Sequence, residues 1–505
     1  MNLNGVESLA YSYPELLLMG AALVIFVADL LVRAKEHLGS VALFGCAFAL
    51  LASIGLRLPF TDTWLIHGLF GWGEGWLYSR MVIVDDFAVF FKVIFCLAAF
   101  ATVWMSLGSN EVRGPNEGEY YGLVLASTVG MLYMASAANL LMAYLSLEFV
   151  SLTSYVLTGY LRHNRRSGEA ALKYLIYGGV ASGMMIYGMS WLYGITGSLD
   201  YAFINAALAQ GTADPLTVFI AVVLILAGFG YKIASVPFHM WAPDVYHGAP
   251  IPVTAFLSVG SKAAGFAILM RLFYPGLSQA AEGGNWQFLA GVDWPQLMLV
   301  ICMATMTLGN LAALSQQNLK RLLAYSSIAH AGYVLMGFVV LNDEGLRAML
   351  FYLITYYLMN IGAFLVVMVV VNSTGREDIE GFRGLAWRGG AVPAVAMAIF
   401  LFSLAGLPPL AGFIGKFYLF AAVVKAEFYL LALVGLANSL VALYYYARVV
   451  RTMFLDMPVG DEGVVVLDAH NACLLYFLAL PTIVLGVYWA PVFDLADRSA
   501  HFFLG

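Results

Sequence analysis

Apolar residues follow one another along most of this 505-residue chain in long blocks, with short polar stretches between them. A helix of about 20 apolar residues crosses a hydrocarbon layer of about 30 Å. This pattern predicts fourteen helices, near residues 12–32, 38–56, 82–105, 119–136, 139–161, 168–195, 216–236, 252–275, 296–315, 320–341, 345–372, 391–424, 427–452 and 469–490. The sequence therefore predicts an all-α integral membrane protein of about 14 transmembrane helices.

Prolines interrupt two of these segments. Pro237, Pro243 and their neighbours follow Lys232 at the end of the seventh segment, and Pro408-Pro409 stands inside the twelfth, which is too long for one plain span. Proline removes a backbone donor and breaks helical hydrogen bonding. Irregular backbone in a membrane is tolerated only where protein or a water-filled cavity surrounds it. We therefore expect helices 7 and 12 to be broken mid-membrane, beside a route for an ion.

The composition excludes several other classes of protein. The chain is 62% hydrophobic and 11% charged, which is too little charge for the surface of a soluble domain. No basic patch suited to nucleic acid, phosphate-binding loop or nucleophile triad is present. The four cysteines stand singly in apolar segments, so their spacing predicts no metal site. No basic stretch precedes the first apolar segment, so we expect the first helix to be retained rather than cleaved.

Basic residues predict the orientation of the chain in the membrane. The loops after odd-numbered helices hold more than twice as many Lys and Arg residues as the opposite loops, so we expect both termini to face away from the cytoplasm. Five basic residues remain within the apolar segments: Lys92, Lys173, Lys232, Lys262 and Lys416. All five are lysines, and a desolvated lysine can lose its proton whereas an arginine effectively keeps it.

Two short motifs recur in the chain. Residues 226–232 (LAGFGYK) reappear at 410–416 (LAGFIGK), and residues 154–159 (SYVLTG) reappear at 332–337 (GYVLMG). Each pair joins one helix to the helix five further on, and an odd offset gives the two copies opposite orientations, as in the inverted repeats of transporters. We predict two inverted five-helix repeats, helices 4–8 and 9–13. The corresponding division of the chain is 1–115, 116–278, 279–455 and 456–505.

Charged residues inside the apolar segments are the candidate functional residues. Glu148 lies mid-span in the fifth helix, where a carboxylate must be protonated or paired, and we expect Lys232 as its partner. Such a pair is either a structural ion pair or part of a proton relay. Lys173 either forms a local pair with Glu169 or belongs to a relay. Lys416 follows the break in helix 12, at a depth that favours function over reaching the interface.

Histidines offer a second kind of proton carrier. His330 can bridge two lysines through water, or it is a hydrogen-bonded core histidine. His239 and His247 flank the break in helix 7 and are more simply read as loop residues. Lys92 has no assigned role, and residues 58–80 yield no interpretation.

Residues 229–250 (FGYKIASVPFHMWAPDVYHGAP) and 258–262 (SVGSK) resemble the seventh and eighth helices of the antiporter-like membrane subunits of proton-pumping NADH:quinone oxidoreductase, respiratory complex I. Among these subunits they are most similar to subunit N. The resemblance covers essentially the whole chain and is strongest over 139–420. It implies that Glu148 matches the fifth-helix glutamate of that family. It also implies that Lys173, Lys232, Lys262 and Lys416 match the relay lysines.

The implied function is one proton channel of a redox-driven pump. This subunit would take part in the enzyme without a redox centre of its own, and NADH, FMN, iron–sulfur clusters and quinone would belong to partner subunits. The implied neighbours are subunits M and K, the lateral helix of subunit L and the lipid bilayer. The implied location is a bacterial inner membrane, with both termini on the periplasmic side. The alternatives are a subunit of a cation/proton antiporter complex or membrane-bound hydrogenase and, more remotely, a structural membrane scaffold.

Overall fold

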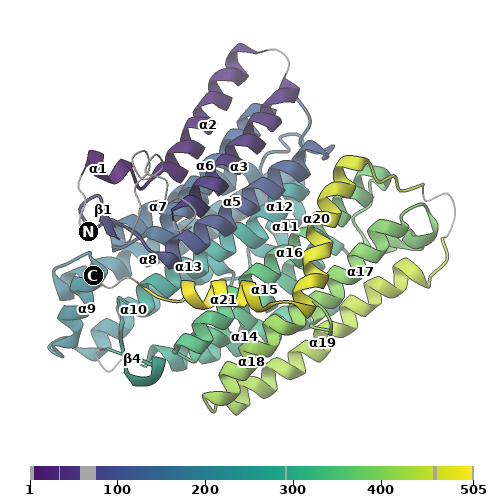
Figure 1. Cartoon of the computed structure of the whole chain (residues 1–505). Coiled ribbons are helices and arrows are strands. Elements are labelled where there is room, and N and C mark those ends of the chain that lie inside the picture. Colours follow the sequence, from purple (N-terminus) through teal and green to yellow (C-terminus); the bar gives the residue numbers. More distant parts are fainter. Residues whose placement is uncertain (1–4, 33–34, 57–74, 290–292, 459–462, 503–505) are drawn as a thin grey trace.

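The computed structural model describes residues 5–32, 35–56, 75–289, 293–458 and 463–502, and most of them lie in helices (Figure 1). Each of the fourteen expected segments is helical in it. Twelve helices of the described part are long and apolar enough to cross a membrane, or thirteen spans if one bent pair is counted. The all-α membrane class is confirmed, whereas the exact number of crossings remains a prediction.

The N-terminal part forms one side of the bundle. It contains α1 (Val6–Leu9), α2 (Tyr13–Leu31), the 3-10 turn η1 (Lys35–His37), α3 (Leu38–Gly55), the strands β1 (Gly75–Leu77) and β2 (Val82–Val84), and α5 (Asp86–Leu107). Helix α2 packs against α3 and against α6 (Glu117–Ser136). The strands β1 and β2 pair antiparallel as a small hairpin that the all-α prediction missed. Of residues 58–80, those before Gly75 lie outside the described part.

The next helices correspond to the first expected repeat. They are α6, α7 (Leu140–Thr158), α8 (Arg165–Thr196), α9 (Tyr201–Ala209), α10 (Pro215–Ile233), α11 (Ala242–Gly248), α12 (Ile251–Phe256), the π-helical turn η3 (Leu257–Ser261) and α13 (Lys262–Phe273). Helix α10 ends where Ala234 takes a left-handed conformation with φ 58°. Helix α11 follows only after a non-helical stretch, so the expected break in the seventh helix is confirmed.

The second expected repeat follows a short hairpin. The elements are β3 (Ser278–Ala280), η4 (Glu282–Gly284), β4 (Trp286–Phe288), α14 (Trp294–Leu314), α15 (Leu319–Val339), α16 (Asp343–Thr374), η5 (Ile379–Phe382), η6 (Leu385–Trp387), α17 (Ala391–Ala405), α18 (Ala411–Lys425) and α19 (Tyr429–Phe454). The twelfth helix is broken between α17 and α18, as expected. Helices α8 and α16 each have 32 residues and end at a left-handed glycine, which agrees with the predicted repeat without testing it.

The C-terminal part contains one helix more than expected. After α20 (Ala469–Val487), the amphipathic helix α21 (Ala490–Ser499) turns across the bundle and packs on α16 and α5 (Figure 1). The sequence predicted α20 but not α21, because α21 is too short and too polar to be recognised as a transmembrane helix.

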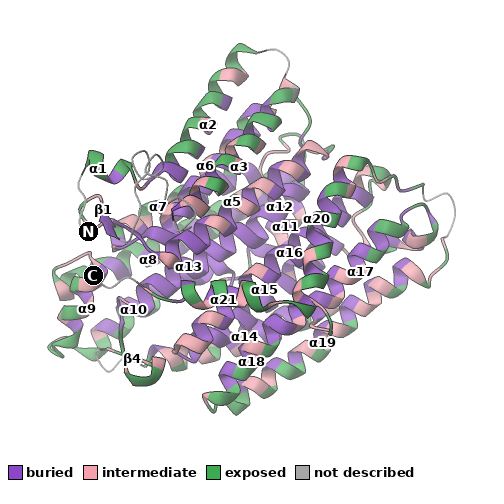
Figure 2. Ribbon diagram, in the orientation of Figure 1, coloured by how far each residue is buried: buried purple, intermediate pink, exposed green. Residues whose placement is uncertain are grey.

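Burial increases toward the middle of the bundle (Figure 2). The span formed by α12, η3 and α13 is buried along its length, and α15 and α16 are almost completely buried, whereas α2 and α19 are largely exposed. The exposed side chains of α2 include Leu23, Val24 and Leu30, as suits a helix facing lipid or another membrane subunit. The central helices are those that carry Lys262 and His330.

The count of basic residues in the loops included Arg271, and the structure contradicts that assignment. Arg271 lies in the last turn of α13 and is buried, not in a loop. Its guanidinium donates to both carboxylate oxygens of Asp85 and, at 2.9 Å, to the carbonyl of Ala135. A bidentate partner and a third acceptor explain how an arginine is accommodated there.

Candidate functional site

Lys232 lies in the last turn of α10, just before the break. Its side chain is buried, and its Nζ donates to Ser151 Oγ on α7 at 3.2 Å. The C-terminal end of a helix carries unpaired carbonyls and partial negative charge, so this position suits an ammonium group. Gly265 on α13 makes room for the lysine, because a Cβ there would lie 3.2 Å from Lys232 Cγ.

The expected direct ion pair between Glu148 and Lys232 is absent from the described part of the structure, so that expectation was wrong. Glu148 lies on α7 one turn before Ser151, and Lys232 reaches the serine instead. The two charges still lie close enough to interact electrostatically. The Oε1 atom of Glu148 is buried and has no hydrogen-bond partner among the residues that the structure describes.

Lys262 is the first residue of α13, directly after the π-helical turn, and it is buried. Its Nζ donates to the Ser327 carbonyl at 2.8 Å and to Ser327 Oγ at 2.5 Å on α15. A small cavity lined by Lys262, Ser327, His330 and Tyr356 adjoins these contacts. Its free volume of about 10 Å³ for the centre of a water molecule is enough for one water.

His330 lies one turn beyond Ser327 on α15 and uses both ring nitrogens. Its Nδ1 is 2.6 Å from the hydroxyl of Tyr352, and its Nε2 is 3.2 Å from the hydroxyl of Tyr446. His330 also interacts electrostatically with both Lys262 and Lys416. His330 is thus near both lysines, and its role as a bridge between them stays a prediction.

Lys416 lies in the second turn of α18, after the break in the twelfth helix. Its Nζ donates to the carbonyl of Ala405 at 3.0 Å, and Ala405 is the last residue of α17. The break thus frees a helix-terminal carbonyl for the lysine. Ser439 Oγ lies 3.4 Å from the ammonium nitrogen, which also stands 4.3 Å from the ring centre of Tyr333.

Lys232 precedes the break in its helix, whereas Lys416 follows the break in its own. Both nevertheless lie near the C-terminal end of a half-helix. Lys232 belongs to the half-helix that ends at its break, and Lys416 reaches across its break to the half-helix that ends there. The backbone of Lys232 and the ammonium of Lys416 thus each lie at the negative, C-terminal end of a broken helix. This accounts for proline following one lysine and preceding the other.

We call Lys232, Lys262, His330 and Lys416 the lysine row. Lys173 does not belong to it. It is partly exposed on α8 and pairs with Glu169, as one reading expected, and with Asp244 of α11, both at 2.7 Å. Asp244 also accepts from Arg321 of α15 at 2.6 Å. Sequence reasoning missed Asp244, which ties the short helix α11 to α8 and α15.

Lys92 has a partner that the sequence did not indicate. Its Nζ lies 2.7 Å from Glu15 Oε1 on α2, and both side chains are 1% exposed. This pair lies among the N-terminal helices, away from the residues around the breaks.

Glu377, in the loop after α16, contacts basic side chains from both halves of the chain. It lies 3.4 Å from Lys320 and from His247, and it accepts from Asn318 at 3.1 Å. Burial raises the pKa of Glu377, but the hydrogen bonds from His247 and Asn318 and the charge of Lys320 outweigh this and hold it at about 2. His247, expected to be an ordinary loop residue, is part of this contact between halves, with Arg166 of α8 3.1 Å away.

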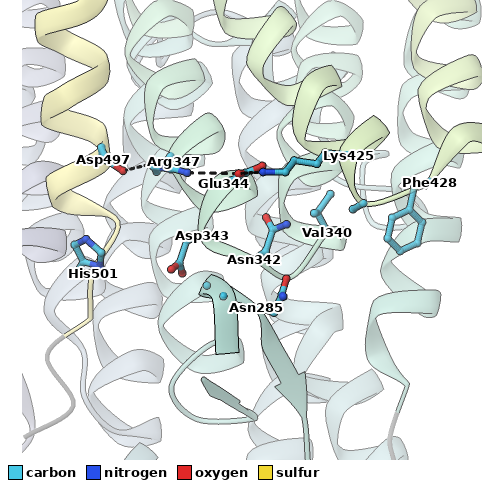
Figure 3. A pocket seen from close by; sticks show the side chains of 13 residues that line it. Asn285, Val340, Asn342, Asp343, Glu344, Arg347, Lys425, Phe428, Asp497 and His501 are labelled. Atoms are coloured by element: carbon cyan, nitrogen blue, oxygen red, sulfur yellow. Dashed lines mark hydrogen bonds and ion pairs between the residues drawn. The ribbon is translucent and has the colours of Figure 1, made fainter. Parts of the chain in front are cut away.

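A surface pocket of about 730 Å³ lies away from the lysine row, near the end of α18 (Figure 3). Its wall carries a chain of ion pairs, in which Arg347 contacts Asp497 at 2.8 Å and Glu344 at 4.0 Å, and Glu344 contacts Lys425. These charges neutralise one another, and Lys416 is not among the residues that line the pocket. The described residues hold no group of three or more His, Cys, Asp and Glu side chains suited to a metal ion.

The residues that sequence reasoning missed are mostly hydroxyl partners. Ser151, Ser327, Ser439, Tyr352 and Tyr446 each contact one of the expected proton carriers. Their signal in the sequence was weak, because serine and tyrosine are common in apolar helices and tyrosine is more simply read as packing. Only the spacing of Ser327 and His330, one helical turn apart, pointed to a shared face.

Comparison with known proteins decides the family. The model of the NADH:quinone oxidoreductase/Mrp antiporter transmembrane family matches residues 137–442. The chain belongs to this family. It is 48% identical to NADH-quinone oxidoreductase subunit N 2 of Sorangium cellulosum, with 98% of each chain covered.

Solved structures agree with this membership. A chain of respiratory complex I from Thermus thermophilus is 30% identical, with a TM-score of 0.77 and coverage of 96% of this chain and 99% of that one. A chain of the Mrp complex from Dietzia sp. DQ12-45-1b has a TM-score of 0.79 at 21% identity, covering 98% and 96%, which shows a shared fold. The part of the chain that matches the family model includes Lys232, Lys262 and Lys416.

Proposed function

We propose that this chain is a proton-conducting membrane subunit of NADH:quinone oxidoreductase, equivalent to subunit N. The observation that carries the proposal is the set of buried residues Lys232, Lys262, His330 and Lys416. Each lysine contacts carbonyl or hydroxyl oxygens, and the histidine contacts tyrosine hydroxyls. High identity to a subunit N over the full chain supports the same assignment. NADH, FMN, iron–sulfur clusters and quinone would be bound by partner subunits.

In this proposal the proton moves along the central helices. Lys232 takes it from the side where Asp244 and Glu377 join the two halves, and passes it to Lys262. From there it crosses the small cavity to His330 and reaches Lys416. Because Glu148 has a buried oxygen without a hydrogen-bond partner, a small movement toward Lys232 would hold the proton on the lysine. Movement away would release it.

The broken helices make these exchanges feasible. A lysine facing a carboxylate at ion-pair distance would keep its proton, whereas Lys232, Lys262 and Lys416 face carbonyl and hydroxyl oxygens. These groups accept hydrogen bonds from the ammonium form without a full counter-charge. Lys173, paired with two carboxylates, is better suited to holding α8 and α11 together.

The remaining assignments rest on the resemblance and on the distribution of basic residues. We place the chain in a bacterial inner membrane with both termini in the periplasm, and the proton leaves on that side. Subunits M and K would be neighbours within the membrane arm, and the lateral helix of subunit L would pass along it. The division at residues 115, 278 and 455, and the inverted repeats, belong to the same proposal.

Purification of the assembled complex tests the assignment. An affinity tag on this chain should isolate a complex that oxidises NADH with quinone and acidifies the lumen of sealed vesicles prepared inside-out. A tagged complex that lacks NADH oxidation and exchanges sodium for protons would instead favour the cation/proton antiporter alternative. The second candidate has one observation in its favour, the shared fold of the Mrp chain.

A further inference from the structure

A buried tyrosine hydroxyl lies beside α7, whose Ser151 accepts from Lys232, and beside η3, which directly precedes Lys262. Tyr174 of α8 is fully buried, yet its hydroxyl has no hydrogen bond of good geometry in the described structure. That hydroxyl lies against the side chains of Ser154 on α7 and Ser261 in η3. A buried hydroxyl without a partner costs free energy, so its position calls for an explanation.

The serines around it present acceptor oxygens. Ser151 Oγ donates to the Leu147 carbonyl at 2.8 Å, and Ser154 Oγ donates to the Val150 carbonyl at 2.5 Å. Each hydroxyl proton therefore points along its own helix, which leaves the oxygen lone pairs free to accept. Ser151 accepts from Lys232, and Ser154 lies one turn further along the same face of α7. Ser261 immediately precedes Lys262 in the chain.

The ring of Tyr174 is held firmly in place. It stacks on Trp241 with ring centres 4.4 Å apart, and Tyr155 packs against it edge-on at 4.9 Å. Its backbone carbonyl accepts from the Tyr231 hydroxyl at 3.0 Å. A fixed ring leaves the hydroxyl proton as the part that rotates, between the α7 side and the η3 side.

We propose that Tyr174 carries the proton between Lys232 and Lys262. This inference rests on the proposed function and adds a residue to it. The hydroxyl oxygen accepts a proton from the Lys232 side, directly or through one water held by Ser154, as it gives its own proton to the Lys262 side near Ser261. Rotation of the hydroxyl then restores the starting state. Tyr174 begins and ends neutral, and one proton has moved.

Replacement of Tyr174 by phenylalanine tests this role, because the ring and its stacking on Trp241 remain. In the assembled complex, Tyr174→Phe should slow NADH-driven proton pumping about ten-fold, which corresponds to about 1.4 kcal/mol on the barrier. The solvent deuterium isotope effect on the pumping rate should rise, since proton transfer between the two lysines becomes rate-limiting. A purely structural tyrosine would leave that isotope effect unchanged.

A matched control removes another buried tyrosine hydroxyl. Tyr120 on α6 is fully buried and bonds Ser106 at 2.7 Å, outside the lysine row, so Tyr120→Phe should keep the native rate and isotope effect. Should Tyr174→Phe fail to assemble, Ser261→Ala replaces it, because it removes the neighbouring hydroxyl and leaves the ring untouched. Ser261→Ala should also raise the isotope effect.

The outcomes separate this inference from the proposed function. Native pumping and isotope effect in Tyr174→Phe, or in Ser261→Ala where the former does not assemble, would overturn the role of Tyr174. An equal loss in Tyr120→Phe would overturn it too. If Lys232→Arg is inactive in the same assay while Tyr174→Phe is native, the lysine relay stands without the tyrosine. If Lys232→Arg also pumps normally, the proposed function itself falls.

Discussion

The buried lysines of this chain differ in what faces them. Lys232, Lys262 and Lys416 have carbonyl and hydroxyl oxygens as partners, and none has a carboxylate at ion-pair distance in the described part. Lys92 has Glu15 at 2.7 Å. A counter-ion fixes a proton on its lysine, whereas neutral dipoles let it leave. On this difference rests our proposal that the first three lysines transfer protons and that Lys92 is structural.

Removing Lys92 tests that distinction at the level of single residues. Lys92→Met leaves Glu15 buried and unpaired, and breaking a buried pair in this way costs about 3–5 kcal/mol. The purified complex should therefore dissociate at a clearly lower temperature. Lys92→Met combined with Glu15→Leu should recover most of the loss, because no charge is left behind. A double variant that pumps poorly although it is stable would show that the pair takes part in transfer.

The sequence indicated which charges are buried but not what they contact. Charges inside apolar blocks are rare, so Glu148 and the lysines stood out in the pattern. Their partners are serines, tyrosines and a backbone carbonyl, which are ordinary residues of membrane helices. A side chain as long as lysine reaches more than one helical turn, so Ser151 and Glu148 were equally reachable from sequence, and the serine is the hydrogen-bond partner.

At the scale of elements, the breaks in the seventh and twelfth helices decide where the lysines find acceptors. The prolines predicted both breaks. At the break in the twelfth helix, the side chain of Lys416 packs closely against Gly406. Gly406 has φ 89°, and a Cβ there would lie 2.9 Å from Lys416 Cδ. Gly375 caps α16 in the same left-handed conformation, φ 69°, with open space around it.

These two glycines make a matched pair of variants. Alanine in a left-handed conformation costs about 1–2 kcal/mol, so Gly375→Ala and Gly406→Ala should both lower the thermal stability of the complex by similar amounts. Only Gly406→Ala should also slow proton pumping, because its methyl group pushes the lysine from the Ala405 carbonyl. Equal pumping rates in the two variants would mean that the position of Lys416 does not matter.

At the scale of the whole molecule, two carboxylates hold the halves together at one end of the bundle. Asp244 of α11 binds Lys173 of α8 and Arg321 of α15. Glu377 receives His247 from the first half and Lys320 from the second. These contacts fix α11, the short segment after the break that Lys232 precedes. Sequence reasoning read His247 as a loop residue and did not single out Asp244 or Glu377, because contacts between distant segments leave no local pattern.

The pKa of Glu377 predicts how that contact responds to pH. A carboxyl group whose pKa is lowered from 4.5 to about 2 stabilises the folded state by about 3 kcal/mol above pH 4.5. That contribution is lost as the pH falls from 4.5 toward 2. Glu377→Gln should therefore lower the thermal stability of the complex throughout the range from pH 8 to 5, by a deficit that does not shrink as the pH falls. A deficit that shrinks within this range would place the pKa of Glu377 much higher than the structure indicates.

The overall class was readable from hydrophobic blocks alone, whereas the hairpins and α21 were not. Each strand has three residues, and α21 is short and amphipathic, so none of them gives a hydrophobic pattern long enough to be recognised in the sequence. Their positions depend on the surfaces that the spans create. The spans themselves follow from the length of an apolar block, which is a local property.

The central claim is that Lys232 gives up its proton during turnover. Lys232→Arg retains the positive charge but effectively cannot deprotonate, so it separates charge from transfer. The most direct measurement uses the assembled variant complex in sealed vesicles. It gives the rate of proton pumping and the number of protons pumped per electron. We predict normal assembly, with pumping reduced at least ten-fold, equivalent to about 1.4 kcal/mol or more on the barrier. Native assembly together with the native rate and proton-to-electron ratio would contradict the account and leave Lys232 a structural residue.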